Sequence, residues 1–323
     1  MLFNTNLEEI IFHRHQTVLS DELVILSGYL GPNPVARLAD LPLNSTVIYG
    51  MYGDRGIQTR LHNALINTQI NVPHINIYYS NVPIHSKCYI WKNQNIIQHA
   101  LIGSANFSTN GLTTPYREIL AETTYDTFQP LDEYIDRVMT NSILCTDIQE
   151  VRDGSNIIQT PSIQISTQFC KMSLLDRNGN VAEKSGLNWM FSAGNVSFND
   201  AYIAIRKDYI RQYPNLFPPK QQFPNINHNG RLQRHNDIIE IIWDDGMTMD
   251  GLLEGSQEER GLIYPKQISS APKKSLMGEY IRYRLGISSG AFVTKEDLLN
   301  YGRTDIDVSL LDEGIYYFDF SIQ

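Results

Sequence analysis

The sequence contains little cysteine and no long apolar segment. Its 323 residues include three cysteines, Cys88, Cys145 and Cys170, too few and too scattered for a disulfide framework or a cysteine-rich zinc site. No apolar run reaches the roughly 18 residues of a membrane span, and the first residues show no basic stretch followed by an apolar core. We therefore expect a cytoplasmic protein with no membrane partner.

The sequence also lacks a nucleotide-binding loop, an internal repeat and a low-complexity tract. Because no Gly-x-x-x-x-Gly-Lys-Ser/Thr motif occurs, any NTP hydrolysis has to come from a separate protein. The remaining composition is ordinary for a folded chain, with 42% hydrophobic and 19% charged residues. The length is sufficient for about two domains, each with its own core.

The formal net charge of -9 argues at first against a nucleic-acid partner, but the charges are unevenly distributed. Residues 1–165 hold 9 Lys/Arg and 15 Asp/Glu, whereas residues 171–234 hold 9 and 4, and residues 260–303 hold 8 and 3. Between the basic segments, residues 237–259 hold 8 acids and no Lys or Arg. Because binding depends on where charges cluster, the two basic segments are suited to be arms around DNA; an uneven solvated surface is the alternative.

The first half alternates apolar strands with amphipathic helices. This pattern predicts an α/β layer with a largely parallel sheet. A β-hairpin, a loop with a short helix, a strand and a closing helix then follow. The expected strands are 23–26, 46–49, 75–79 and 118–123, and the hairpin is 85–102. The expected helices are 7–18, 32–41, 57–67 and 126–143, and the loop with its short helix is 103–112. Polar residues 147–162 are the candidate linker, so we expect one domain over 1–160 and another over 161–323.

The second half changes to short strands separated by frequent turns, which predicts a barrel-like β domain. Residues 201–205 form one expected strand and residues 238–249 a hairpin. Residues 275–285 and 294–301 are expected helices, the second opened by Thr294 and Asp297 as a variant of the capping box. Two strands within 306–320 close the chain.

Polar side chains of several kinds should meet at the start of the hairpin. Side chains two apart on a strand share a face, so His85 and Lys87 point the same way, and Cys88 points to the packed face. The hairpin returns Ser104 and Asn106 to the side of His85. An imidazole, an ammonium, a hydroxyl and an amide together suit an anion with several oxygens, and phosphate is the natural candidate.

This ordered set, His85 and Lys87, then Gly103, Ser104 and Asn106, then Glu118, resembles the signature of the phospholipase D superfamily. An ordinary buried hairpin with satisfied polar groups is the alternative. The family usually carries an Asp five residues after the Lys, where this sequence has Lys92. The resemblance implies that His85 attacks phosphorus, that Glu118 fixes its tautomer, and that Lys87, Ser104 and Asn106 hold the phosphate oxygens. Glu122 is the fallback for Glu118, and Lys92 is an extra candidate contact to phosphate.

Three segments of the second half, residues 186–189, 201–205 and 293–305, resemble the C-terminal part of the NgoFVII family of restriction endonucleases. Proteins of that type, like their relative BfiI, join a phospholipase-D-like nuclease domain to a B3-like DNA-recognition domain, a pseudobarrel. The resemblance therefore implies an α/β phospholipase-D-like nuclease domain followed by a β-rich B3-like pseudobarrel domain. It also implies a type II-like restriction endonuclease that acts on double-stranded DNA.

The implied reaction is metal-independent phosphodiester hydrolysis through a covalent phosphohistidine, with no cofactor. No clustered carboxylates accompany His85, as a Mg²⁺ nuclease would need. The other seven of the eight histidines lack the surrounding set, so the second catalytic histidine is expected to be His85 of another copy. This predicts a homodimer that shares one active site. Relatives also imply a separate NTP-hydrolysing subunit as a partner.

Two polar stretches of the second half carry the side chains suited to base edges and phosphates. Trp189, which lies in the first stretch, is as a residue type more often core than base-stacking. The candidate DNA-binding residues are Asn188, Trp189, Asn195, Asn199, Lys273, Lys274, Ser275, Arg282 and Arg284. Two other functions remain open from the sequence: a phospholipid hydrolase with the same catalytic set, and a DNA-binding regulator with an inactive nuclease domain.

Overall fold

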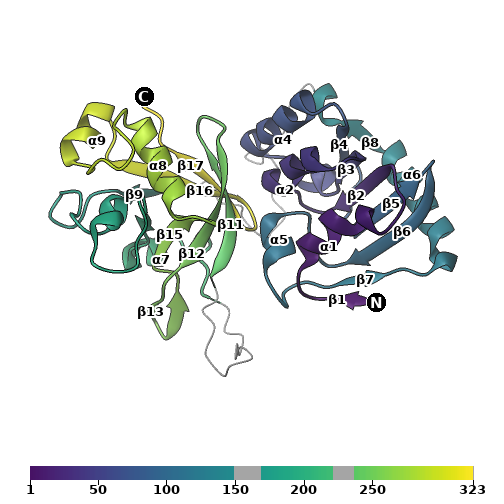
Figure 1. Ribbon diagram of the computed structural model, residues 1–323, viewed down its shortest axis with the longest axis horizontal. Helices are drawn as coiled ribbons and strands as arrows, with labels where there is room; N and C mark the ends of the chain where they lie inside the picture. Colours follow the sequence, from purple (N-terminus) through teal and green to yellow (C-terminus); the bar gives the residue numbers. More distant parts are fainter. Residues whose placement is uncertain (149–168, 221–235, 323) are drawn as a thin grey trace. The chain divides into compact units, whose positions relative to one another are not determined.

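The chain divides into two compact units, Met1–Ile165 and Ser166–Gln323, in a computed structural model (Figure 1). The structure describes residues 1–148, 169–220 and 236–322. Apart from its first two residues, the linker expected at 147–162 lies outside the described residues. The two units are described separately below.

The first unit is built on an eight-stranded sheet with the strand order β1-β7-β6-β5-β2-β3-β4-β8. Its strands are β1 Leu2–Phe3, β2 Glu22–Ser27, β3 Asn44–Tyr49, β4 Ile75–Ser80, β5 Lys87–Asn93, β6 Ile96–Gly103, β7 Leu120–Glu122 and β8 Ser142–Leu144. Within this sheet β2, β3 and β4 are parallel, and the remaining neighbours are antiparallel. The predicted largely parallel sheet is therefore wrong. The alternation of strands with helices ends at β4, and the tight turn at Gln94 and Asn95 makes β5 and β6 antiparallel.

Helices cover both faces of this sheet. They are α1 Leu7–His13, α2 Pro32–Arg37, α3 Tyr52–Arg55, α4 Thr59–Asn71, α5 Thr109–Thr113 and α6 Phe128–Thr140, with 3-10 turns η1 Arg14–Gln16, η2 Leu38–Asp40, η3 Tyr125–Thr127 and η4 Cys145–Asp147. On one face Ile135 and Val138 of α6 pack in a cluster with Val24 and Ile90. Helices α1, α2 and α4 lie on the other side (Figure 1). Cys88 belongs to the α6 cluster, which confirms that it packs rather than faces the polar site.

The second unit contains a nearly closed, barrel-like sheet of seven strands in the order β10-β15-β12-β11-β17-β16-β9. They are β9 Cys170–Ser173, β10 Ile203–Ala204, β11 Asp237–Trp243, β12 Thr248–Glu254, β15 Gln267–Ser270, β16 Asp305–Asp312 and β17 Ile315–Asp319. Strands β11 and β17 are parallel, and the other neighbours are antiparallel. The predicted barrel-like β domain is confirmed.

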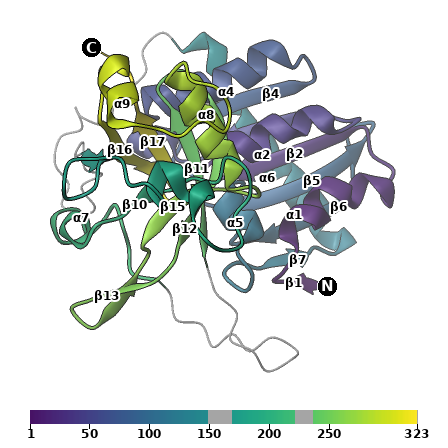
Figure 2. The ribbon, with the colours of Figure 1, turned by 60° about the vertical axis from the view of Figure 1, so that its left-hand side comes forward.

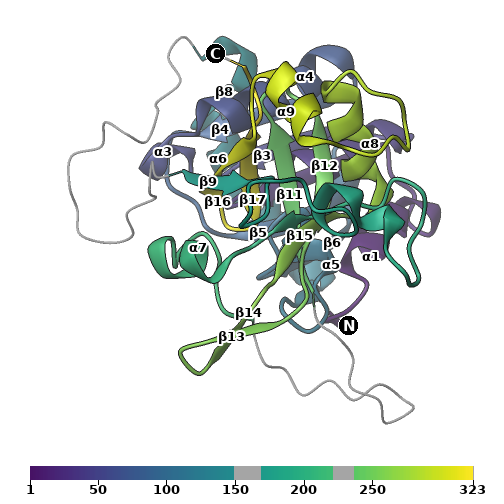
Figure 3. The same ribbon diagram turned by 90° about the vertical axis from the view of Figure 1, so that its left-hand side faces the viewer.

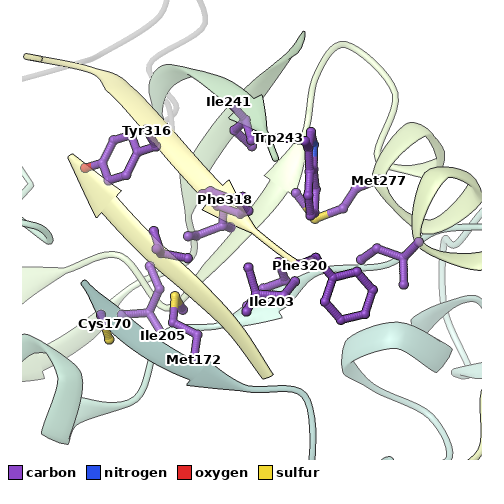
Figure 4. Close-up of a cluster of buried hydrophobic side chains, with 14 of the residues drawn as sticks. Cys170, Met172, Ile203, Ile205, Ile241, Trp243, Met277, Tyr316, Phe318 and Phe320 are labelled. Carbon is purple, nitrogen blue, oxygen red and sulfur yellow. The ribbon is translucent and has the colours of Figure 1, made fainter. Parts of the chain in front are cut away.

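The interior of this sheet is filled by large apolar side chains (Figure 4). The Trp243 ring lies 4.6 Å from the Tyr280 ring and 5.2 Å from the Phe318 ring, measured between centroids. Met277 packs in the same cluster from helix α8, Ser275–Arg284. Because these residues come from strands and helices far apart in the sequence, their burial fixes the arrangement of the unit.

Shorter elements surround the sheet of the second unit. They are η6 Gly186–Phe191, α7 Lys207–Gln212, β13 Gln257–Glu259, β14 Leu262–Tyr264, α8 and α9 Lys295–Tyr301. Helices α8 and α9 lie at the same end of the unit (Figure 3), and the β13–β14 hairpin extends away from the sheet (Figure 2). The expected capping box is confirmed, since Thr294 and Asp297 exchange the two hydrogen bonds that define it. In neither unit is a described helix long and apolar enough to span a membrane.

Candidate active site

His85 and Lys87 meet at the start of β5. Lys87 is the first residue of the strand and is buried, whereas His85 lies in the preceding loop and is exposed. The Lys87 Nζ atom lies 2.9 Å from the His85 Nδ1 atom and donates to the His85 carbonyl oxygen at 2.6 Å. Because only Ser86 separates the two residues, the Lys87 ammonium lies against the exposed His85 imidazole.

Gly103 allows the returning strand to come close to its neighbour. As the last residue of β6, it is in register with Lys87 of β5 on one side and Leu120 of β7 on the other. A Cβ atom at this position would lie 2.0 Å from the Ile119 carbonyl oxygen, well inside contact distance. Only glycine fits without a shift of the backbone, so the glycine sets the spacing of the strands that lead to Ser104 and Glu118.

Asn106 is oriented by the end of β2. Its Oδ1 atom accepts a hydrogen bond from the Tyr29 backbone N–H at 3.3 Å and lies 3.5 Å from the Ser27 Oγ atom. The Ser27 hydroxyl is fully buried, accepts from the Phe107 N–H at 2.9 Å and donates to the Tyr29 carbonyl at 2.6 Å. With the amide oxygen used in this way, the Nδ2 amino group is the end of Asn106 suited to bind an anion.

Gly28 brings His85 and Asn106 to one place. A Cβ atom on Gly28 would lie 3.4 Å from the His85 Cδ2 atom and 3.5 Å from the Asn106 Oδ1 atom, so both side chains border this glycine. The Tyr29 ring meets the His85 ring edge-on with 5.9 Å between centroids. Sequence reasoning missed Ser27, Gly28 and Tyr29, because the pairing of β2 with β5 that brings them here involves distant residues.

Ser104 and Glu118 lie on neighbouring segments. The exposed Ser104 accepts a hydrogen bond from the Ile119 N–H at its Oγ atom, 3.1 Å away, and its own N–H donates to the Ile119 carbonyl at 3.0 Å. The Glu118 carboxylate lies 3.7 Å from the Arg117 Nε atom. Burial raises the pKa of the Tyr89 hydroxyl, and the charge of the Glu118 carboxylate raises it further. Tyr89 donates to the Ala105 carbonyl at 2.8 Å, between Ser104 and Asn106.

Glu118 precedes β7 instead of lying on the expected strand, and its hydrogen bond to His85 stays a prediction. The fallback residue, Glu122, is engaged elsewhere, 3.0 Å from the Met1 ammonium and 3.7 Å from Arg14. The hydrogen bond from that ammonium lowers the pKa of Glu122. Glu118 is therefore the better candidate of the two acids.

Lys92 is not a phosphate contact. Its Nζ atom lies 2.6 Å from the Asp132 Oδ1 atom of α6. Lys92 comes five residues after Lys87, which is about 16 Å along an extended strand. The expectation that Lys92 contacts phosphate is wrong, because the residue lies toward the other end of the strand and is paired there.

His85, Lys87 and Asn106 thus place an imidazole, an ammonium and an amide around one point at the ends of β2 and β5. These groups suit an anion with several oxygens, and the exposed imidazole is placed to act as a nucleophile or as an acid and base. Across residues 1–148, 169–220 and 236–322, no three His, Cys, Asp or Glu side chains are placed to hold a metal ion together.

Three of the candidate DNA-binding residues are internal in the second unit. Asn188 is fully buried, and its amide bonds both the N–H and the carbonyl of Val293, each at 2.8 Å. Asn199 bonds Ser289 and Gly290, and Arg282 donates to three backbone carbonyls. Burial lowers the pKa of Arg282. For these three, the expected base contact is wrong, because their polar groups are used to join loops of the domain.

Arg284 is also committed within the domain. Its guanidinium forms two hydrogen bonds to the Asp244 carboxylate, at 3.0 and 2.8 Å, and it donates to the hydroxyls of Tyr280 and Tyr301. In this bidentate pair the planar guanidinium faces the planar carboxylate, and the side chains of Arg284 and Asp244 are only 12% and 10% exposed. The contact of Arg284 with DNA stays a prediction, and this pairing argues against it.

The other five candidates are at least partly exposed. Asn195 and Lys273 are exposed, and Ser275, the first residue of α8, is partly exposed. The Lys274 ammonium lies 2.7 Å from Glu254 and 4.8 Å from the centre of the Trp189 ring. The roles of Asn195, Trp189, Lys273, Lys274 and Ser275 in DNA binding stay predictions.

Some solved structures are similar to part of the chain. NucT from Helicobacter pylori is 15% identical with a TM-score of 0.34, over 45% of this chain and 97% of that one. The phosphatidylserine synthase of Haemophilus influenzae Rd KW20 is 13% identical with a TM-score of 0.35, over 46% and 41%. Nuc from Salmonella typhimurium, a phospholipase D family member, is 14% identical with a TM-score of 0.28, over 39% and 82%. No match was found among curated proteins.

Two family models match consecutive parts of the chain. Residues 5–153 match the N-terminal PLD domain of the NgoFVII restriction endonuclease. Residues 162–312 match the C-terminal B3-like DNA-binding domain of the same enzyme. Together the two matches cover nearly the whole sequence in the order in which the family carries its domains. The chain belongs to the NgoFVII family of restriction endonucleases, with a PLD nuclease domain followed by a B3-like DNA-binding domain.

Proposed function

We propose that the chain cleaves double-stranded DNA by metal-independent phosphodiester hydrolysis through a covalent phosphohistidine, and that it acts as a homodimer. Residues 1–160 would carry catalysis and dimerisation, and residues 161–323 sequence-specific DNA binding. The observation that carries the proposal is the meeting of the exposed His85 imidazole with the Lys87 ammonium and with the Asn106 amide across Gly28. A scissile phosphate bound there faces a nucleophile and two donors to its oxygens.

In the first step a ring nitrogen of His85 attacks phosphorus. A nitrogen–phosphorus bond forms, the bond to the leaving oxygen breaks, and a second histidine donates the proton that this oxygen takes. Lys87, Asn106 and Ser104 hold the non-bridging oxygens, where negative charge increases in the transition state. Glu118 accepts a hydrogen bond from the other ring nitrogen and so keeps the attacking nitrogen unprotonated.

In the second step water replaces histidine on phosphorus. The second histidine, now neutral, takes a proton from the water as its oxygen attacks, and the nitrogen–phosphorus bond breaks. We assign the second histidine to His85 of a second copy, because no other histidine of the chain has the same surrounding set. A two-fold axis through the site would then place the two imidazoles on opposite sides of one phosphate.

Plasmid cleavage in EDTA tests this proposal. The wild-type chain is expected to produce discrete fragments, His85→Ala none, and the exposed-histidine control His13→Ala the wild-type pattern. Stopping a reaction on radiolabelled DNA with alkaline detergent should trap label on the wild-type protein, in a bond that is stable in base and is lost in acid. Cleavage by His85→Ala, or loss of wild-type cleavage in EDTA, would refute the mechanism.

Subunit mixing tests the shared site. If each cut needs both copies of His85, activity in a freely exchanging mixture of wild type and His85→Ala falls with the square of the wild-type fraction. A linear fall would mean that each copy works alone.

A separate NTP-hydrolysing subunit is the remaining partner in the proposal. If this subunit is required, the isolated chain should bind DNA specifically but cleave it only when the subunit and NTP are added. Full cleavage by the isolated chain would show that no such partner is required.

A further inference from the structure

Two loops of the DNA-binding unit carry exposed phenylalanine side chains. Phe191 ends η6 and Phe198 lies in the loop that follows, with exposed fractions of 39% and 64%. Phe292 lies in the loop between α8 and α9 and is 43% exposed. Phenylalanine is usually buried, so three such rings on two short loops are unusual for a surface that meets only water.

The three rings lie on one loop surface, which we call the aromatic patch. The Phe191 and Phe292 rings are 5.3 Å apart between centroids. Phe198 lies over the backbone of Gly290, where a Cβ atom would be 2.2 Å from the ring. Gly290 has a φ of +77°, and it is two residues from Phe292. A side chain at Gly290 would displace Phe198, so the glycine makes room for the ring.

Buried polar side chains hold the two loops together under the patch. The Asn199 amide donates to the Ser289 hydroxyl at 2.7 Å and accepts from the Gly290 N–H at 2.8 Å. Arg282 connects the Ala291 carbonyl, at 2.8 Å, with the Leu187 carbonyl, at 3.0 Å. These internal bonds fix the backbones that carry the rings. The patch is therefore presented on a firm support, as a preformed contact surface requires.

The surroundings of the patch suit a polyanion. Helix α8 packs against the Phe198 loop, since a Cβ on Gly278 would lie 1.9 Å from the Asn199 carbonyl oxygen. Lys273 is exposed just before that helix. The Lys274 ammonium is paired with Glu254 at 2.7 Å and lies over Trp189, two residues before Phe191. Residues 260–303 hold 8 Lys/Arg against 3 Asp/Glu; among them Lys273 is exposed, whereas Arg282 and Arg284 are used within the domain. Apolar rings beside positive charge match the bases and phosphates of DNA.

We propose that the aromatic patch, Phe191, Phe198 and Phe292, contacts bound duplex DNA through its bases and sugars, with Phe198 as a wedge at a base-pair step. This inference rests on the proposed function, because it takes DNA as the ligand of the second unit. Phe198 is the most exposed of the three rings, and the Gly290 backbone behind it keeps it from folding away. An apolar wedge unstacks the step that it enters and bends the duplex.

The test uses the full chain and a duplex that the wild type selects from a random-sequence pool. Affinity is measured by fluorescence anisotropy over a range of salt concentrations, and bending by energy transfer between the duplex ends. Phe198→Ser is expected to weaken binding about ten-fold or more and to reduce the bend. The slope of affinity against salt should stay unchanged, because no phosphate contact is lost. Phe292→Ser should act in the same direction.

Leu299→Ser, at a 58% exposed apolar position on α9, is the matched control and is expected to bind DNA like the wild type. Hydrolysis of bis(p-nitrophenyl) phosphate and the melting temperature should be the same in all variants, since neither depends on the patch. Wild-type affinity in both phenylalanine variants would overturn the proposal. Wild-type affinity together with a changed oligomeric state by light scattering would instead make the patch a protein contact. Failure of the wild type to select any duplex would overturn the proposed function as well.

Discussion

The backbone N–H of Tyr29 donates a hydrogen bond to the Oδ1 atom of Asn106, with 3.3 Å between nitrogen and oxygen. Tyr29 follows β2 and Asn106 follows β6, so the bond joins segments 77 residues apart in the sequence. It fixes which end of the Asn106 amide is available to phosphate. Part of the candidate site is therefore built by residues outside the motif that identifies it.

Ser27→Ala tests this support. The change removes the acceptor of the Phe107 N–H and the donor to the Tyr29 carbonyl, both within a buried environment. An unsatisfied buried group costs about 1–3 kcal/mol, so the free energy of unfolding in urea should fall by that amount. Cleavage should fall further than stability accounts for, because Asn106 loses its fixed orientation.

Ser20→Ala is the control for this prediction. The Ser20 hydroxyl bonds the Val18 carbonyl at 3.1 Å and is not part of the site. We expect it to leave cleavage unchanged. If Ser27→Ala cleaves DNA at the wild-type rate when fully folded, Ser27 does not position Asn106.

Two glycine substitutions should separate stability from activity. A Cβ at Gly103 would lie 2.0 Å from a backbone oxygen, so Gly103→Ala must shift β7, at a cost of several kcal/mol in unfolding free energy. A Cβ at Gly28 meets His85 and Asn106 at 3.4 and 3.5 Å. Gly28→Ala should therefore fold nearly normally and lose cleavage, because the added methyl group occupies the space between the two side chains. The stability of both variants is measured by urea unfolding and their activity by plasmid cleavage. A Gly28→Ala protein that is strongly destabilised, or that is stable and cleaves DNA normally, would contradict the prediction.

The local parts of the candidate site could be predicted from the sequence. His85 and Lys87 are neighbours on one strand start, and the β5–β6 hairpin is closed by the turn at Gln94 and Asn95. Ser27 could not be predicted, because its place beside Asn106 depends on the antiparallel pairing of β2 with β5. No pattern of neighbouring residues in the sequence predicts that β2 pairs with β5. The same limit explains why the sheet was expected to be largely parallel.

Polar residues in the second unit show a related limit. Composition predicts that Asn188, Asn199 and Arg282 contact DNA, because amides and guanidinium groups bind base edges. The same groups also bond backbone N–H and carbonyl groups, and in this domain they join loops. Residue type cannot distinguish the two uses, because the difference lies in burial. Phenylalanine is usually a core residue, but Phe198 is 64% exposed.

Arg284 and Lys273 should behave differently when substituted. Arg284→Ala leaves the Asp244 carboxylate, which is nearly buried, without its bidentate partner, and should lower the unfolding free energy by about 3–5 kcal/mol. Lys273→Ala, at an exposed position, should leave stability unchanged, weaken DNA binding and reduce its salt dependence. Thermal melting and gel shifts at several salt concentrations measure both effects. A stable Arg284→Ala protein that fails to bind DNA would restore Arg284 as a DNA contact.

The three cysteines should be unreactive in the folded protein. Burial raises the pKa of Cys88, Cys145 and Cys170 to about 12 in each case, so almost no thiolate is present near neutral pH. A thiol reagent such as DTNB should therefore release little colour from the native chain and three equivalents after denaturation. Rapid reaction of one native thiol would show that its surroundings open.

Folding stability should decrease on mild acidification, partly through His62. Burial lowers the pKa of His62, whose Nδ1 atom lies 3.1 Å from the Tyr79 hydroxyl. Below the unfolded pKa of about 6.5, the unfolded chain binds a proton that the folded chain does not. The free energy of unfolding therefore falls as the pH falls through this range, and it is recovered above it. Burial and the charge of Arg14 lower the pKa of His99 in the same sense.

His62→Gln keeps a group that can bond Tyr79 but cannot titrate. The loss of melting temperature between about pH 7.5 and about pH 5.5 should be smaller in this variant than in the wild type. Some loss should remain, because His99 still titrates. His13→Gln, at an exposed position, should leave the wild-type dependence unchanged. If His62→Gln loses as much melting temperature as the wild type, protonation of His62 does not contribute to acid destabilisation.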